Sequence, residues 1–162
     1  EAVRSSGSAS VVAQSNLEVA PAYEIPANSW IVDVRGADVE MFGIWPNLAN
    51  KDAYNGQLYF ARKGEGETSF AWNLRAGQGH RCTVSVWLPH LHKKRYAAED
   101  ATYTIRHANG EDAVPLNLQE AESGWVPLGD FDINSDSRLV LTNKANGFIV
   151  ADAVLLTKTS KA

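Results

Sequence analysis

The sequence predicts an all-β domain, either a sandwich or a barrel, from three observations. Apolar and polar residues alternate along short runs, as they do in strands that turn one face inward. Turn dipeptides that accept positive φ separate these runs at short intervals. No segment carries a helical period of adequate length. About nine or ten short strands with regular turns are typical of a sandwich or a barrel.

Length and composition limit the possible classes. The chain has 162 residues, which suits one domain and allows a full hydrophobic core. Cys82 is the one cysteine, so an intrachain disulfide and a multi-cysteine metal cluster are excluded. The net charge of −4 argues against a nucleic-acid partner. No run approaches the roughly 18 apolar residues that span a bilayer, so we expect no membrane segment.

The chain divides unevenly into two parts. Residues 1–28 are rich in Ser, Ala, Gly, Asn and Pro, so they offer little apolar surface to offset the entropy of ordering. We interpret them as a linker or a loosely attached leader, with a short strand at residues 11–13 or 17–19 as an alternative. Residues 29–162 are predicted to form the β-sandwich domain.

The first predicted strands follow directly from this boundary. In chain order they cover residues 30–34, 39–42, 57–61, 68–74 and 82–87. The fourth strand places Phe70, Trp72 and Leu74 on one face. The fifth places Cys82, Val84 and Val86 on one face and Thr83, Ser85 and Trp87 on the other. Because the second set is more polar, we expect Trp87 to lie on a more open face, whereas Trp30, Trp72 and Trp125 are expected in the core.

The later strands are separated by clearer turn signals. They are predicted at residues 101–107, 113–119, 125–133, 138–142 and 148–156. Asn109-Gly110 lies between two alternating runs and is the strongest hairpin signal in the chain. Residues 93–100 are expected to form at most one short helical turn. Asp152 lies among apolar residues of the last predicted strand, so its charge requires partners.

Four segments of the domain carry motifs of a known family. They are CTVSVWLP (82–89), ATYTIRHANG (101–110), GWVPLGDF (124–131) and ANGFIVADAV (145–154). They resemble the corresponding motifs of golvesin C-terminal-like domains, which also occur in xanthan-lyase-type secreted proteins. The resemblance covers roughly residues 30 to 157. It implies a galactose-binding-like jelly roll in a secreted or cell-surface protein, appended to a catalytic domain. Residues 89–96 depart from the family pattern because they are basic and aromatic.

The candidate ligand-binding residues form two groups. Sugars are recognised by aromatic rings and by planar polar side chains that take hydroxyl groups. The first group begins with the last residue of the strand at 82–87 and continues into the loop after it. It suits a carboxylated or sulfated polysaccharide, because Arg binds an anion through two hydrogen bonds. It consists of Trp87, His90, His92, Lys93, Arg95 and Tyr96. The second group lies within residues 45–54 and includes Trp45, Asn47, Asn50, Lys51 and Tyr54.

Catalytic and metal-binding patterns are weak. No His-Glu-x-x-His or Gly-x-Ser-x-Gly motif occurs in the sequence. His107 is interpreted as a structural hydrogen-bonding residue. Residues 130–136 have the oxygen spacing of a calcium loop, but Ser135 stands where Gly is needed, so an outward-facing strand is the better interpretation. We expect no cofactor, with a structural calcium ion at Asp33 or Asp152 as an alternative.

These observations support three hypotheses about function. The first is a non-catalytic carbohydrate-binding module for an acidic polysaccharide. The second is a structural module that packs against a neighbouring catalytic domain without a ligand of its own. The third is a small polysaccharide-degrading enzyme, which the absence of catalytic motifs disfavours.

Overall fold

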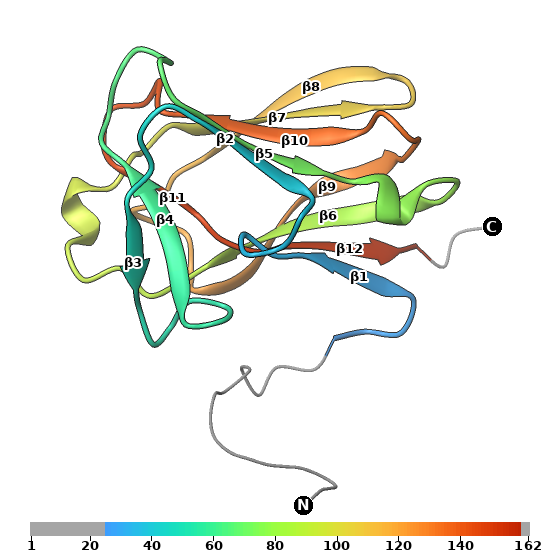
Figure 1. Cartoon of the computed structure of the whole chain (residues 1–162), viewed down its shortest axis with the longest axis horizontal. Coiled ribbons are helices and arrows are strands. Elements are labelled where there is room, and N and C mark those ends of the chain that lie inside the picture. Colours follow the sequence, from blue (N-terminus) through green and yellow to red (C-terminus); the bar gives the residue numbers. More distant parts are fainter. Residues whose placement is uncertain (1–24, 160–162) are drawn as a thin grey trace, which may run out of the picture.

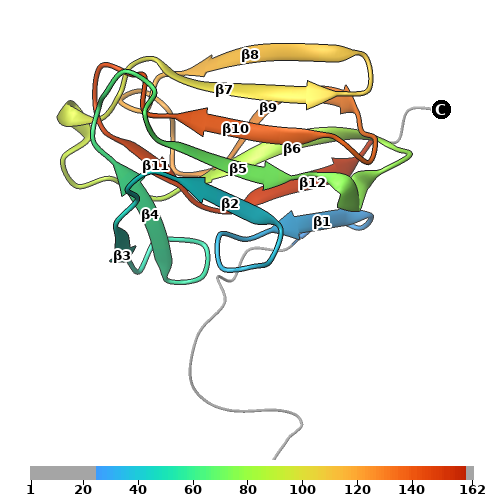
Figure 2. The same ribbon diagram turned by 45° about the horizontal axis from the view of Figure 1, so that its top comes forward.

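A computed structural model describes residues 25–159, which form two packed β-sheets with a small third sheet at one end (Figures 1 and 2). This arrangement confirms the predicted all-β sandwich. The predicted leader at residues 1–28 falls mostly outside the described residues, as do both of its possible strands. No helix in the described part of the chain is long and apolar enough to cross a membrane.

The three sheets are antiparallel, and their strand orders interleave distant parts of the chain. The four-stranded sheet runs β1 (Ser29–Val32), β12 (Val154–Lys158), β6 (Arg81–Leu88) and β9 (Gly124–Asp132). The five-stranded sheet runs β2 (Val39–Phe42), β5 (Ser69–Asn73), β10 (Arg138–Thr142), β7 (Ala101–His107) and β8 (Gly110–Leu116). The three-stranded sheet runs β11 (Ile149–Ala151), β4 (Gln57–Ala61) and β3 (Asn47–Ala49).

The core lies between the two large sheets and follows the predicted alternation. Phe70, Trp72 and Leu74 are almost completely buried, which confirms the inward face predicted for β5. The predicted inward face of β6 is confirmed as well, with Cys82 and Val84 fully buried. Burial of such side chains is the main favourable term in folding. The period-two pattern therefore identified the core-facing side of both strands correctly.

The prediction of one continuous strand over residues 148–156 is wrong. The segment forms β11 in the small sheet and β12 in the four-stranded sheet, with Asp152 and Ala153 between them. Asp152 therefore lies in the connection between two sheets and not inside a central strand. Because almost every residue here is buried, the run has no polar position that marks the break.

Smaller differences occur at turns and short elements. The predicted hairpin is present, but its turn residues are Ala108 and Asn109, and Gly110 begins β8 with a φ of 135°. β8 ends at Leu116, earlier than the predicted strand at 113–119. The expected single helical turn is η2, a 3₁₀ helix at Lys94–Tyr96. β3 and the 3₁₀ helix η1 (Arg75–Gly77) were not predicted, because three residues are too few to establish a period.

Candidate functional site

A groove lies at the end of the sandwich, between the three-stranded sheet and the loop that follows β6. Its volume is about 330 Å³, and most of its lining is apolar. The apolar lining residues are Leu48, Leu58, Phe60, Leu91, Phe148 and Val150. The polar lining residues are Asn50, Arg62, His90, His92 and Lys93.

A second hollow continues this groove toward η2. Its volume is about 350 Å³, and it shares Arg62 and Phe148 with the first. Its other lining residues are Lys63, Arg95, Tyr96, Ala97, Gln119, Asn146 and Gly147. We refer to the two hollows together as the end groove. In Figure 1 the segment with η2 projects beside β4 and β11 at this end of the molecule.

Backbone hydrogen bonds fix the loop that carries η2. The Phe148 N–H donates to the Tyr96 carbonyl oxygen at 3.1 Å, and the Ala98 N–H donates to the Phe148 carbonyl oxygen at 2.9 Å. The Gln119 side-chain amide donates to the carbonyl oxygens of Arg95 and Ala97 at 3.1 and 3.0 Å. The side chains of η2 are therefore presented by a segment in which the carbonyl oxygens of Arg95, Tyr96 and Ala97 all accept hydrogen bonds.

The end groove has a positive rim. Arg62, Lys63, Lys93 and Arg95 are exposed, and none of them forms an ion pair within residues 25–159. No acidic residue lines either hollow in the described part of the chain. The Arg95 guanidinium lies 4.9 Å from the centre of the Tyr96 ring, within the range of a cation–π contact. The rim can therefore attract an anion, while the floor offers apolar contact.

The structure brings together most of the first group of predicted residues. His90, His92, Lys93, Arg95 and Tyr96 all line the end groove and are exposed. The rings of His90 and His92 meet edge to face at 5.6 Å. Their role in ligand binding stays a prediction.

Several lining residues outside this loop were missed, among them one pair of cations and two aromatic residues. Phe60, Arg62 and Lys63 come from the end of β4 and the residues after it, and Phe148 precedes β11. The adjacent cations Arg62 and Lys63 were a visible signal in the sequence. Their proximity to residues 90–96 depends on the pairing of β4 with β11, which local patterns do not reveal.

The expectation that Trp87 lies on an open face is wrong. Trp87 is only 5% exposed, and its indole N–H donates to the Asp52 carbonyl oxygen at 2.9 Å. Its ring packs edge to face against Tyr54 and Trp125, with ring centres 5.8 and 5.1 Å away. The loop between β3 and β4 covers this face of β6, so the Trp87 ring is not presented to a sugar.

The second predicted group does not form one surface. Trp45 is buried against Phe70, and its indole N–H donates to the Ser69 carbonyl oxygen at 3.0 Å. Tyr54 is half-buried and packs against Trp87 and Trp125. Both rings therefore stabilise the fold instead of facing the end groove. In the same segment, Asn50 reaches the groove.

Asp152 is buried and connects three parts of the fold. Its carboxylate accepts the N–H of Tyr54 at 3.0 Å and that of Ala153 at 2.8 Å. Its carbonyl oxygen accepts the indole N–H of Trp72 at 2.9 Å. Burial raises the pKa of Asp152 to about 7, although the two N–H donors act in the opposite direction. These contacts confirm that the charge has hydrogen-bonding partners.

Two further predictions concern histidine and metal. His107 forms a hydrogen bond to Asp112 through Nε2 at 2.7 Å, and its Nδ1 accepts the Asn109 N–H at 3.2 Å, which confirms its structural role at the hairpin.

Within residues 25–159, no three His, Cys, Asp or Glu side chains gather in a way that could hold a metal ion. A calcium ion at Asp33 or Asp152 stays a prediction.

Comparisons with known proteins bear mainly on the fold. Residues 30–158 match the family model of the Golvesin C-terminal domain. A Paenibacillus xanthan lyase structure aligns with a TM-score of 0.71 and 24% identity, over 82% of this chain and 13% of that one. This chain therefore spans only a small part of that protein's length. The structural likeness shows that the two share a fold.

Two other solved structures align less well. A family two carbohydrate esterase from Cellvibrio japonicus gives a TM-score of 0.47 and 14% identity, over 81% of this chain and 34% of that one. The Clostridium thermocellum endo-1,4-beta-D-xylanase 10B, complexed with xylohexaose, gives a TM-score of 0.44 and 10% identity, over 82% of this chain and 27% of that one. No curated protein matches the chain.

Proposed function

The chain belongs to the Golvesin C-terminal domain family, and we propose that it is a non-catalytic carbohydrate-binding module for an acidic polysaccharide. In this proposal it acts as an accessory domain of a secreted or cell-surface protein and accompanies a catalytic domain. The observation that carries the proposal is the end groove, where four cations without ion pairs surround an apolar floor.

The chemistry of the end groove suits a polymer of anionic sugars. Phe60, Phe148 and Tyr96 offer ring surfaces to the apolar face of a pyranose. Arg62 and Arg95 carry guanidinium groups that can fork onto a carboxylate or a sulfate. Asn50 offers its side-chain N–H groups to sugar hydroxyls, and Gln119, whose N–H groups bind the loop, offers its amide oxygen. The two joined hollows give room for more than one sugar unit.

The proposal is tested by titrating the full chain with acidic and neutral polysaccharides at low and high salt in a calorimeter. We expect binding to the acidic polymer, weakened by salt because exposed charges are screened. Arg62→Gln and Arg95→Gln should each lower affinity about five- to ten-fold. Lys144→Gln removes an exposed cation outside the groove and should leave affinity unchanged. Equal losses in all three variants would contradict a site in the end groove.

A different observation favours packing against a neighbouring domain as a second candidate function. Four apolar residues around β2 and β3 are strongly exposed: Met41 (47%), Phe42 (72%), Ile44 (79%) and Leu48 (45%). Exposed large apolar side chains mark interaction surfaces in many proteins. We call this set the apolar edge.

The second candidate is tested with the adjoining domain of the same polypeptide supplied as a separate chain. Association in analytical ultracentrifugation that is lost in the double variant Phe42→Ser with Ile44→Ser supports packing. Because both side chains are exposed, these changes should leave the fold intact. Retained association in the double variant, or no association of the parent chain, would contradict this function.

A further inference from the structure

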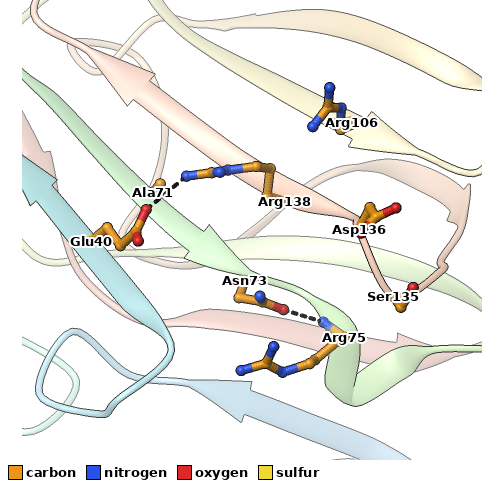
Figure 3. A pocket seen from close by; sticks show the side chains of 8 residues that line it. All are labelled: Glu40, Ala71, Asn73, Arg75, Arg106, Ser135, Asp136 and Arg138. Carbon is orange, nitrogen blue, oxygen red and sulfur yellow. Dashed lines mark hydrogen bonds and ion pairs between the residues drawn. The ribbon is translucent and has the colours of Figure 1, made fainter.

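A separate hollow lies on the outward face of the five-stranded sheet, away from the end groove (Figure 3). It measures about 260 Å³ and shares no lining residue with the end groove. Three arginines surround it: Arg75 after β5, Arg106 on β7 and Arg138 on β10. We call it the arginine hollow.

Strand alternation places these arginines outside the core. On β10, Leu139 and Leu141 are fully buried, so the side chain of Arg138, which precedes Leu139, points to the opposite, outward face. The pairing registers set Arg138 opposite Asn73 on β5 and opposite Arg106 on β7. Arg138 therefore stands in the middle of a row that crosses three strands.

The floor of the hollow is formed where the sheet carries a small side chain. Ala71 on β5 is opposite Glu40 on β2 and Val140 on β10, and it offers only a methyl group. The Arg138 guanidinium reaches across this position to the Glu40 carboxylate at 3.2 Å, as Figure 3 shows. The space above Ala71 is thus framed by polar groups.

The arginines in this hollow are unequally paired. Arg138 pairs with Glu40, and Arg75 pairs with Asp38 at 3.0 Å. Arg106 forms no ion pair with any residue in the 25–159 range. Arg106 is the direct cross-strand neighbour of Arg138 on β10 and of Glu111 on β8; the like charges of the two arginines repel each other. A ligand anion between them would relieve this repulsion.

The other side chains that line the hollow can form hydrogen bonds with the hydroxyl groups of a ligand. Glu40 and Asp136 provide carboxylate acceptors, while Asn73 and Ser135 can both donate and accept hydrogen bonds. The volume is below the roughly 300–1,000 Å³ typical of sites for drug-sized ligands, which suits one compact ring. No aromatic residue lines the hollow, so polar contacts must supply the recognition.

We propose that the arginine hollow is a second binding site, which takes a single acidic sugar unit. Its carboxylate lies between Arg106 and Arg138, because a guanidinium binds a carboxylate through two parallel hydrogen bonds. Its hydroxyl groups bond to Glu40, Asn73 and Asp136. This site is independent of the end groove and does not require that the groove bind a polymer.

The test is a chemical-shift titration of the full ¹⁵N-labelled chain with sodium D-glucuronate, alongside D-glucose and sodium sulfate. We expect saturable shifts at the amides of Ala71, Asn73 and Val140 with glucuronate. Glucose lacks the carboxylate and sulfate lacks the ring hydroxyls, so both should bind at least ten-fold more weakly. Arg106→Gln should weaken glucuronate binding at least ten-fold, and Arg106→Lys should weaken it less because the charge remains.

The control variant is Arg95→Gln, which removes a cation of the end groove and should leave these shifts unchanged. The spectrum of each variant also reports whether the fold is retained. Shifts confined to the end groove, or equal binding of sulfate and glucuronate, would overturn the proposal. If Arg95→Gln loses polymer binding but keeps the glucuronate-induced shift at Ala71, the two sites bind their ligands independently, as proposed.

Discussion

At the residue scale, Asp152 links three segments that are distant in sequence. Its carboxylate holds the loop between β3 and β4 through the Tyr54 N–H, and its carbonyl oxygen holds Trp72 of β5. Only 3% of the residue is exposed, so the ionised form lacks most of its hydration. This burial makes the protonated carboxyl more favourable than it is in an unfolded chain.

The stability of the fold should therefore depend on the protonation of Asp152. Its pKa is raised from 3.8 to about 7 by burial, so the folded form keeps a proton that the unfolded chain has lost between these values. Its contribution to stability is fully present below about pH 4 and is lost as the pH rises toward 7. The shift corresponds to at most roughly 4 kcal/mol.

The measurement compares the parent chain with Asp152→Asn by urea unfolding between pH 4.5 and 7.5. The free energy of unfolding of the parent, relative to the variant, should fall by about 2–4 kcal/mol across this range, because the variant cannot titrate. A difference that stays constant with pH would show that this carboxyl titrates in the same range in both states.

Gly147 allows its own backbone to lie close to the backbone of Tyr96 and Ala97, and this contact shapes the end groove. A Cβ at this position would lie 2.5 Å from the Ala97 carbonyl carbon and 2.6 Å from the Tyr96 oxygen. Both are backbone atoms, which cannot move aside without shifting the loop that carries η2. The absence of a side chain at one residue therefore positions several groove residues.

Gly147→Ala should destabilise the chain by about 1–3 kcal/mol, in the range typical of overpacked sites. Urea unfolding measures this loss. Gly36→Ala is the matched control, because its added methyl group would come no closer than 3.3 Å to the Asp33 carbonyl oxygen. An equal effect in the two variants would argue that the contact with Ala97 is not the cause.

At the element scale, the connection between β11 and β12 joins the small sheet to the core. β11 pairs with β4, whereas β12 pairs with β1 and β6. The chain changes sheets within two residues, and the Trp72 indole N–H stabilises the turn by binding the Asp152 carbonyl oxygen. The end groove depends on this change, because β11 and β4 form part of its floor.

Trp72→Phe should destabilise the fold by about 2–4 kcal/mol, because it removes this hydrogen bond and leaves a cavity in the core. Urea unfolding monitored by circular dichroism measures the loss. Trp30→Phe is the control, since Trp30 is only half-buried and stacks on His80; it should cost about 1 kcal/mol or less. Similar losses in both variants would contradict the role of the Asp152 contact.

At the scale of the whole molecule, Cys82 reports on the opening of the sandwich. Its side chain is fully buried on β6, and burial raises the pKa of its thiol. The thiolate is the reactive form, so reaction with a thiol reagent requires the core to open. We expect labelling by Ellman's reagent in buffer to be on the order of 10³-fold slower than in 8 M urea, or slower still. Rapid labelling in buffer would indicate that the sheets open locally at β6.

Different parts of the molecular surface also present different chemistry. The five-stranded sheet carries the arginine hollow on its outward face, while the end groove lies over the small sheet. The apolar edge comprises residues of β2 and β3, which are edge strands of the five-stranded and three-stranded sheets, and one residue between them. One sandwich therefore displays three surfaces, of which the apolar edge and the end groove share Leu48, whereas the arginine hollow shares no residue with either.

The sequence by itself determined the fold class, most of the strands and the inward faces of β5 and β6. These features are local, because period-two alternation and turn residues act over a few positions. It also located residues 90–96 as a basic and aromatic loop. The family motifs narrowed the predicted fold class to a jelly roll, and the family match at residues 30–158 supports this prediction.

Only the tertiary structure decided which of these side chains are accessible and which of them meet. Trp87 alternates with polar residues, yet a loop from another part of the chain covers it. Arg62 meets Arg95 at one groove because β4 pairs with β11, and Arg106 stands beside Arg138 because β7 pairs with β10. Such pairings join residues far apart in sequence, so no local period encodes them.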